Sequence, residues 1–132
     1  MTDRELLELA AKAAGIELGW GIYERGFLIE PISKCFHRTE TGRRKEWNPL
    51  TDDGDVLRLA VSLLRLGRSV HLDIYAHAVN ARLYPEEFGK PPIEARCWTN
   101  RAAQGATDIY DVDEATRRAI VLAAAEAGKG MP

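Results

Sequence analysis

Residues 47–63 read WNPLTDDGDVLRLAVSL, and they contain the clearest start of a helix in the chain. One of residues 51–53 should cap the first backbone amides, because threonine and aspartate side chains accept hydrogen bonds there and acidic groups suit the positive end of the helix dipole. From residue 56 to residue 66 nearly every side chain is apolar, and Gly67 ends the run. This pattern predicts a helix that is heavily buried.

The chain after this helix alternates between apolar and polar residues, which is typical of a strand with one face in the core. We predict one strand over residues 70–78, then a loop through the prolines at 85, 91 and 92, and a second strand at 93–98. The polar face of the first strand would carry His71, Asp73, Tyr75 and His77, and its apolar face Val70, Leu72, Ile74 and Ala76.

Helices are also predicted at the two ends of the sequence. Thr2 and Glu5 have the spacing of a capping box, in which each side chain bonds an amide left open at the helix start. An apolar stripe follows, and Gly15 ends this first helix. The last helix is rich in alanine; Asp111 with Glu114, or else Asp113, should open it, and it should end at Gly128. Its small side chains would allow a close approach to a sheet or to another helix.

The elements therefore follow the order helix, strands, helix, strands, helix, with strand-like stretches at 18–29 and 32–38 before the middle helix. This order favours an α+β fold in which three helices pack on an antiparallel or mixed sheet of four to five strands. A length of 132 residues corresponds to a single domain over residues 1–132. With 45% apolar and 29% charged residues, the composition excludes a disordered chain.

Three segments resemble the phage ABA sandwich domain of small bacteriophage and prophage proteins. They are residues 47–63, the run EATRRAIVLAAAEAG at 114–128, and the opening run ELLELAAKAAGIEL at 5–18. The resemblance implies an α/β/α layered fold and a phage or prophage origin, and it implies no activity. A sheet covered on both faces should be apolar on both. Because residues 70–77 alternate, either their strand lies at an edge or helices cover only one face there.

The densest polar cluster lies at the start of the middle helix. Its members are Trp47, Asn48, Asp52, Asp53 and Asp55. Several carboxylates close together can bind Mg²⁺ or Ca²⁺, but this spacing lacks the further ligands of a calcium loop. Aspartates at the start of a helix are also its ordinary caps. We favour the capping interpretation and keep a site for a small molecule or nucleotide as the alternative.

Histidines and one aspartate form a second candidate site. His71, Asp73 and His77 share one face of the predicted strand at 70–78, and His37 lies on another predicted strand. If the two strands pair, His37, His71 and Asp73 could bind Zn²⁺, and an Asp–His pair could act as a general base. The closely spaced Cys or His pairs of structural zinc sites are missing from the sequence. A solvated strand face is therefore the favoured interpretation, and no metal or cofactor is predicted.

A basic turn that includes Arg43 and Arg44 is the third candidate. Residues 31–49 carry a charge of +3, whereas the first thirty residues carry −3. Such a turn could meet phosphate or an acidic protein. The whole chain has 18 Lys and Arg against 20 Asp and Glu, a net charge of −2, and duplex binding normally needs a basic domain. We therefore expect a solvated turn rather than a nucleic-acid site.

Two adjacent arginines stand near the start of the last helix. Neighbouring residues on a helix point about 100° apart, so at most one of Arg117 and Arg118 is expected to face a buried partner. An arginine paired with an aspartate of residues 52–55 would tie the last helix to the start of the middle one. This pairing is a structural hypothesis, not a site.

Location is predicted from three features of the sequence. The N-terminus reads as a helix rather than a signal peptide, and the apolar runs are far shorter than the ~20 residues that span a bilayer. Cys35 and Cys97 are expected to be free thiols in a reducing compartment. These features predict a cytoplasmic protein, in the host cytoplasm if the chain comes from a phage.

Function is predicted as non-enzymatic. We expect an accessory protein that binds a host or phage macromolecule, most simply a protein, with inhibition of a host defence complex as one specific version. Protein binding predicts an exposed aromatic patch that includes Tyr84, Phe88 or Trp98. The alternative is a small-molecule or nucleotide-binding protein with its pocket near residues 47–55. The oligomeric state stays open, with a homodimer as one option.

Overall fold

The computed structural model describes residues 2–20, 22–24, 27–29, 35–38, 44–100 and 109–131. Among them are three helices, α1 (Asp3–Ala14), α2 (Asp53–Arg65) and α3 (Val112–Lys129). The strands are β1 (Leu18–Trp20), β2 (Ile22–Glu24), β3 (Phe27–Ile29), β4 (Cys35–Arg38), β5 (Arg44–Glu46), β6 (Ser69–Ile74), β7 (Ala78–Tyr84), β8 (Ile93–Thr99) and β9 (Ile109–Tyr110). The predicted α+β class with three helices is confirmed.

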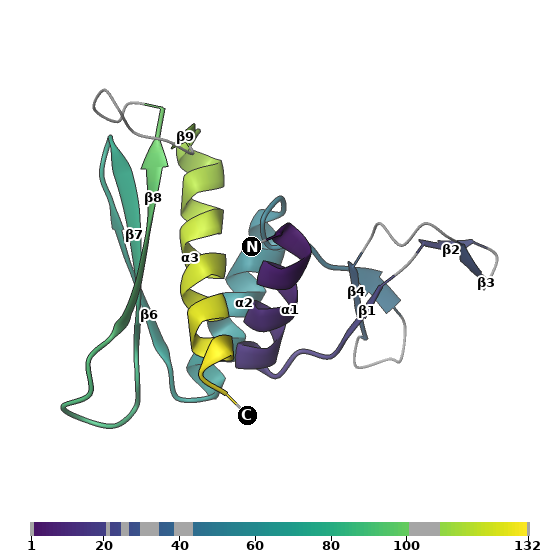
Figure 1. The fold of residues 1–132 in the computed structure, drawn as a ribbon, viewed down its shortest axis with the longest axis horizontal. Helices are drawn as coiled ribbons and strands as arrows, with labels where there is room; N and C mark the ends of the chain where they lie inside the picture. The colour runs from purple at the N-terminus through teal and green to yellow at the C-terminus, as the bar shows by residue number, and fades with distance from the viewer. Residues whose placement is uncertain are drawn as a thin grey trace.

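One sheet contains the longest strands and lies beside the helices (Figure 1). β6, β7 and β8 pair antiparallel in that order, and the two-residue β9 adds a parallel strand next to β8. The remaining strands lie on the far side of the helices (Figure 1), where β1, β4 and β5 form one small sheet and β2 and β3 another. The first strands of the chain therefore do not extend the larger sheet.

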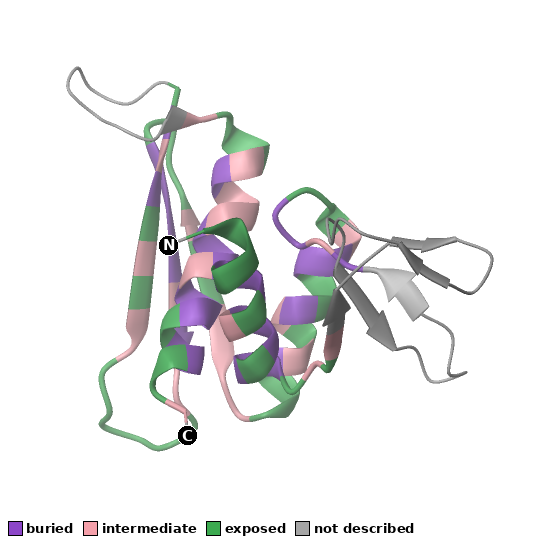
Figure 2. Ribbon diagram, turned by 45° about the vertical axis from the view of Figure 1, so that its right-hand side comes forward, coloured by how far each residue is buried: buried purple, intermediate pink, exposed green. Residues whose placement is uncertain are grey.

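The described helices all cover the same face of the larger sheet. Figure 1 shows α3 directly against β7 and β8, with α1 packed on the other side of α3 and α2 next to both. Figure 2 shows that the buried residues gather between these layers. The larger sheet is thus followed on one side by α3 and then by α1 and α2, and no described helix lies on its other face, so the α/β/α order implied by the resemblance is not formed in the described part of the chain. Both explanations for the alternating strand hold, because β6 is an edge strand and no described helix lies over its polar face.

The prediction of a single strand at 70–78 is wrong, because the chain reverses at residues 75–77. The amide of Tyr75 donates to the carbonyl of Ala78 (2.8 Å), which closes the turn. Thr99 of β8 holds the turn from outside: its amide donates to His77 O (2.9 Å) and its hydroxyl donates to Ala76 O. Much of the segment predicted as a loop is β7, the second strand of the sheet, where Val79, Ala81 and Leu83 are fully buried.

The predicted helix caps are confirmed. Thr2 and Glu5 form the capping box of α1, and Gly15 follows that helix with φ 69°, a left-handed conformation that glycine adopts without strain. The side chain of Asp52 accepts from the amide of Asp55, and that of Asp111 accepts from the amide of Glu114 (2.8 Å each). These bonds satisfy donors that the helix starts would otherwise leave open.

Helix α2 is less buried than its sequence predicts. Its side toward the core is covered, but Leu57 is 65% exposed and Leu64 is 59% exposed. The reason is positional: α3 occupies the covered face of the sheet, so α2 packs only along the margin of α1, α3 and β6. None of the described helices is both long and apolar enough to cross a membrane.

Helices α1 and α3 run parallel and approach closely at their C-terminal ends. The Lys12 ammonium donates to Met131 O (2.9 Å) at this end, and Arg118 bonds Asp3 (3.0 Å) at the other. A β-carbon added to Gly128 would lie 2.1 Å from the carbonyl oxygen of Leu9. Only glycine therefore fits this position without moving one of the two backbones.

We expect Gly128→Ala to destabilise the fold by about 2–4 kcal/mol, because overpacking against backbone forces the helices apart. Urea unfolding followed by circular dichroism measures the change. The matched control is Gly130→Ala, where the nearest atom is 3.7 Å from the added carbon and φ is −78°. Equal stability of the two variants would contradict the close crossing.

Candidate functional site

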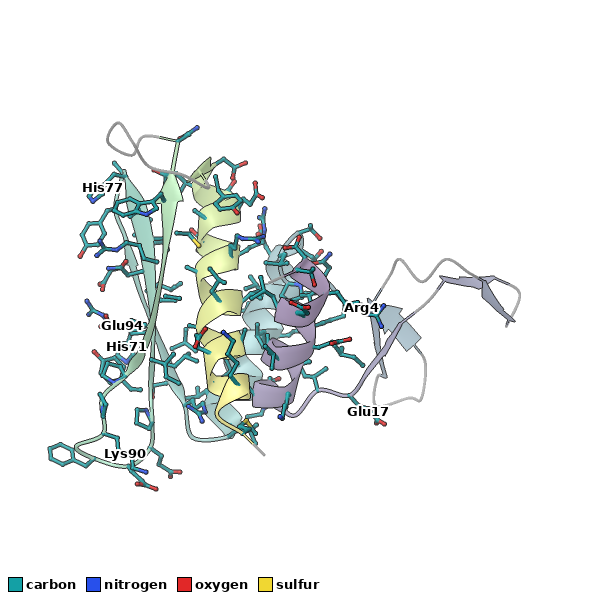
Figure 3. All side chains as sticks on the ribbon, in the orientation of Figure 1. Arg4, Glu17, His71, His77, Lys90 and Glu94 are labelled. Atoms are coloured by element: carbon teal, nitrogen blue, oxygen red, sulfur yellow. The ribbon has the colours of Figure 1, made fainter. Side chains whose placement is uncertain are left out.

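One face of the larger sheet points away from the helices, and we call it the open face. The strand register sets its side chains in four rows: Ser69 with Tyr84; His71, Arg82 and Glu94; Asp73, Asn80 and Arg96; and Ala78 with Trp98. Figure 3 shows His71, His77 and Glu94 on this side of the sheet, directed away from α3. The opposite side chains of the same strands form the core.

Two arginines in the middle of the open face are held by neighbouring strands. Arg82 on β7 lies between Asp73 on β6 (3.2 Å) and Glu94 on β8 (3.0 Å). The contact with Glu94 is close but not aligned as a hydrogen bond, and it leaves the Nε atom of Arg82 without one. The charge of Asp73, with that of Glu94, raises the pKa of Arg82 against the opposing effect of burial. The ion pairs with Asp73 and Glu94 therefore position Arg82 more than hydrogen bonds do.

The second arginine connects the charged rows to an aromatic group. Arg96 Nε donates to Asn80 Oδ1 (2.6 Å), and its guanidinium lies 5.4 Å from the ring centre of Trp98. Trp98 in turn lies 6.3 Å from His77, and His77 stacks on Tyr75 at 5.8 Å. At the other end of the face, His71 meets the edge of Tyr84 at 4.6 Å. Aromatic and arginine side chains thus run across the whole open face.

The residues of the predicted histidine site do not come together as ligands of one metal ion. Asp73 is taken up by Arg82, and His71 and His77 contact different aromatic residues. His37 lies on β4, which pairs with β1 and β5 on the other side of the helices, so the condition that its strand pairs with β6 is not met. Among the residues the structure describes, three His, Cys, Asp or Glu side chains nowhere come close enough to hold a metal ion.

The cluster at the start of α2 has most of its polar groups occupied by its own backbone. The amide of Asn48 donates to Asp55 Oδ2 (2.9 Å), and Asn48 Oδ1 accepts from the amide of Leu50 (3.1 Å). Asp52 caps the helix, and Arg58 bonds the remaining oxygen of Asp55 (3.1 Å). Trp47 is only 1% exposed and belongs to the core. A ligand here would have to displace several of these bonds.

Asp53 is the member of this cluster that reaches another helix. Arg117 of α3 donates to Asp53 Oδ1 (2.8 Å) and, through Nε, to the carbonyl of Leu50 (2.9 Å). The predicted bridge between the last helix and the start of the middle one is confirmed. The expectation that at most one of the two adjacent arginines faces a buried partner also holds: Arg117 bonds the carbonyl of buried Leu50, whereas the Asp3 carboxylate that Arg118 bonds is 64% exposed.

We expect Arg117→Met to cost about 1–3 kcal/mol of unfolding free energy, because the Leu50 carbonyl loses its charged donor. Asp53→Asn should cost less than about 1 kcal/mol, since the Asp53 side chain is 85% exposed and its ion pair is screened by water. Urea unfolding of the two variants and of the double variant tests this order. A larger loss for Asp53→Asn would contradict it.

An apolar groove of about 630 Å³ opens between α2, the start of α3 and the edge of β6. Leu72 and Ile74 line it from the sheet, and Ile74 is 57% exposed although it points toward the core side. Leu57 borders the groove from α2. Its signal in the sequence is the run of apolar residues at 56–66, although such a run by itself predicts burial within the chain.

Cys97 lies on the core side of β8 and is a free, buried thiol. Burial raises its pKa from 9.0 to about 11, although the charge of Arg118 acts in the opposite direction. The reactive form of cysteine is the thiolate, so this residue is chemically inert near neutral pH. The structure gives it a packing role, as its place beside Ile93 and Ala95 predicts.

Stability should fall as the pH rises from about 9 to about 11. In this window the unfolded thiol loses its proton while the folded one keeps it, so the unfolded state binds fewer protons and is favoured by increasing pH. The loss attributable to Cys97 reaches roughly 2–3 kcal/mol at the upper end. Other groups also titrate there, so the measurement is the difference in pH dependence between the wild type and Cys97→Ala. Parallel curves would contradict the raised pKa.

The basic turn is the candidate that the structure addresses least. Arg43 lies outside the described residues, and Arg44 is placed only as the first residue of β5, without a described side chain.

The sequence analysis does not identify Asn80, Arg82 and Arg96 as site residues, because it predicts a loop where β7 lies. The alternation of residues 79–84 is the signal that could have placed them.

Comparisons with protein-family models, with curated proteins and with solved structures find no match to this chain. The resemblance to the phage ABA sandwich domain therefore stays a prediction that rests on the three sequence segments.

Proposed function

We propose that this protein is a non-enzymatic binding protein and that it takes a protein partner on the open face of the β6–β9 sheet. The observation that carries the proposal is the band of aromatic and arginine side chains on a sheet face over which no described helix lies (Figure 1). Tryptophan, tyrosine and arginine are the residue types that most often dominate the energy of protein interfaces. A phage or prophage origin and a host protein as partner, in the host cytoplasm, belong to the same proposal.

The rigidity of the open face supports binding by a preformed surface. Arg82 is held by two carboxylates, Arg96 by Asn80 and Trp98, and the turn before β7 by Thr99. A side chain that is already fixed loses less conformational entropy on binding than a free one.

The charge of the open face favours a protein over a nucleic acid. Arg82 and Arg96 are balanced by Asp73 and Glu94, so the face offers no surplus of positive charge. A nucleic acid depends on such a surplus for most of its affinity. A protein surface with mixed charges around apolar contacts matches this face better.

Capture of host proteins on the tagged chain, identification of the bound protein and calorimetry with the purified pair test the proposal. Trp98→Ala and Arg96→Ala should each weaken the complex by about 10- to 100-fold, the usual cost of removing an interface hot spot. Arg4→Ala is the matched control for Arg96→Ala, since Arg4 is a half-exposed arginine on α1, away from the open face (Figure 3).

Binding that is unchanged in both open-face variants would overturn the proposal. So would a captured nucleic acid whose affinity falls steeply with salt. The alternative of a nucleotide or small molecule near residues 47–55 predicts a different result: a rise in melting temperature with nucleotides or divalent metals, and no effect of Trp98→Ala.

A further inference from the structure

Helix α2 is apolar over a wide arc and polar along one stripe of Arg58, Ser62 and Arg65, and the described chain covers only part of the apolar arc. The covered side holds Val56, Leu59 and Leu63. The uncovered side holds Leu57, Val61 and Leu64, which we call the outer seam. The apolar face of an amphipathic helix is normally buried over its whole width. The outer seam therefore lacks the cover that its sequence requires.

The outer seam has the geometry of a helix–helix contact. Its members are spaced four and three residues apart, which is the spacing of the a and d positions that pack two helices against each other. The seam continues onto the sheet across the apolar groove, where Leu72 and Ile74 are also exposed. β6 is an edge strand without lysine or proline, the residues that commonly protect such an edge. A covering helix would remove both exposed surfaces from water.

The charges at the two ends of α2 indicate which molecule covers the outer seam. Asp52 caps the helix and Asp53, its first residue, bonds Arg117, yet both side chains remain exposed; the helix ends with Arg65 and, after the turn, Arg68. Two such helices placed antiparallel bring each acidic end beside a basic end and also align their dipoles favourably. We propose that a second copy of this chain covers the outer seam, with the two α2 helices antiparallel about a twofold axis near Val61.

A single register satisfies the apolar and the charged residues together. With the twofold axis between Ala60 and Val61, Leu57 of one copy lies opposite Leu64 of the other, and Asp53 faces the C-terminal end of the other α2, which Arg65 and Arg68 flank. An interface between identical patches closes on itself, so it yields a dimer rather than a filament. This inference does not depend on the proposed partner of the open face, which lies on the other side of the sheet.

Sedimentation velocity over a range of concentrations tests the dimer. The wild type should sediment as a species of twice the chain mass, and Val61→Glu should weaken the association by at least about 100-fold, because two like charges would meet at the axis. Val61 is 40% exposed in the monomer, so the variant should keep its circular dichroism spectrum. Phe88→Glu introduces the same charge on an exposed apolar residue elsewhere and should leave the dimer unchanged.

Cysteine cross-linking tests the antiparallel register. In a chain with Cys35→Ser, the variants Leu57→Cys and Leu64→Cys are oxidised separately and as a mixture. The mixture should form a disulfide-linked dimer, whereas each variant alone should not, because residue 57 meets residue 64 and not itself.

Three results would overturn the inference. They are a wild type that stays monomeric up to its solubility limit, a dimer that Val61→Glu leaves intact, and cross-linking of each cysteine variant with itself, which would indicate parallel helices. Trp98→Ala should not change the dimer, and this result separates a failure here from a failure of the open-face proposal.

Discussion

Helix α3 is packed on two sides, by the sheet and by α1, and the other elements are arranged around this constraint. A helix in such a position can carry few long side chains, and its buried residues are mostly alanine, with Gly128 where the two helices come closest. Small side chains bring the layers together but bury little apolar area each. The large core residues therefore come from other elements, above all Trp47, Leu59, Leu63 and Leu83.

The same packing sets the electrostatics at one end of the helices. Parallel α1 and α3 place their N-termini at the same end, where the partial positive charges of the two dipoles repel each other. Acidic residues offset this: Asp3 stands in the first turn of α1, and Asp111 caps α3. Arg118 then ties α3 to Asp3, and Arg117 ties it to the start of α2. For Arg118, burial is the largest single effect and lowers the pKa, but the hydrogen bond and charge of Asp3, together with Tyr110 and Cys97, raise it overall.

Local signals in the sequence proved sufficient for the helices and insufficient for the sheet. Thr2, Asp111 and Gly15 were placed correctly because a cap depends only on a few neighbouring residues. The turn at 75–77 was missed because its geometry is held by Thr99, far away in the sequence, and the apolar–polar alternation continues through it. At the candidate site, the polar face of β6 was recognised, but its partners on β7 and β8 depend on strand register, which the sequence does not state.

The overprediction of burial for α2 is the most informative of these differences. A hydrophobic pattern indicates that a side chain is more stable when buried away from water. It does not indicate whether the same chain or another molecule buries it. When the chain itself leaves an apolar seam exposed, the pattern becomes evidence about association. The outer seam and the open face lie on opposite sides of the sheet, so a dimer through α2 leaves both open faces free. Two identical faces on one dimer could then bind a repeated or dimeric partner with an avidity beyond that of either face alone.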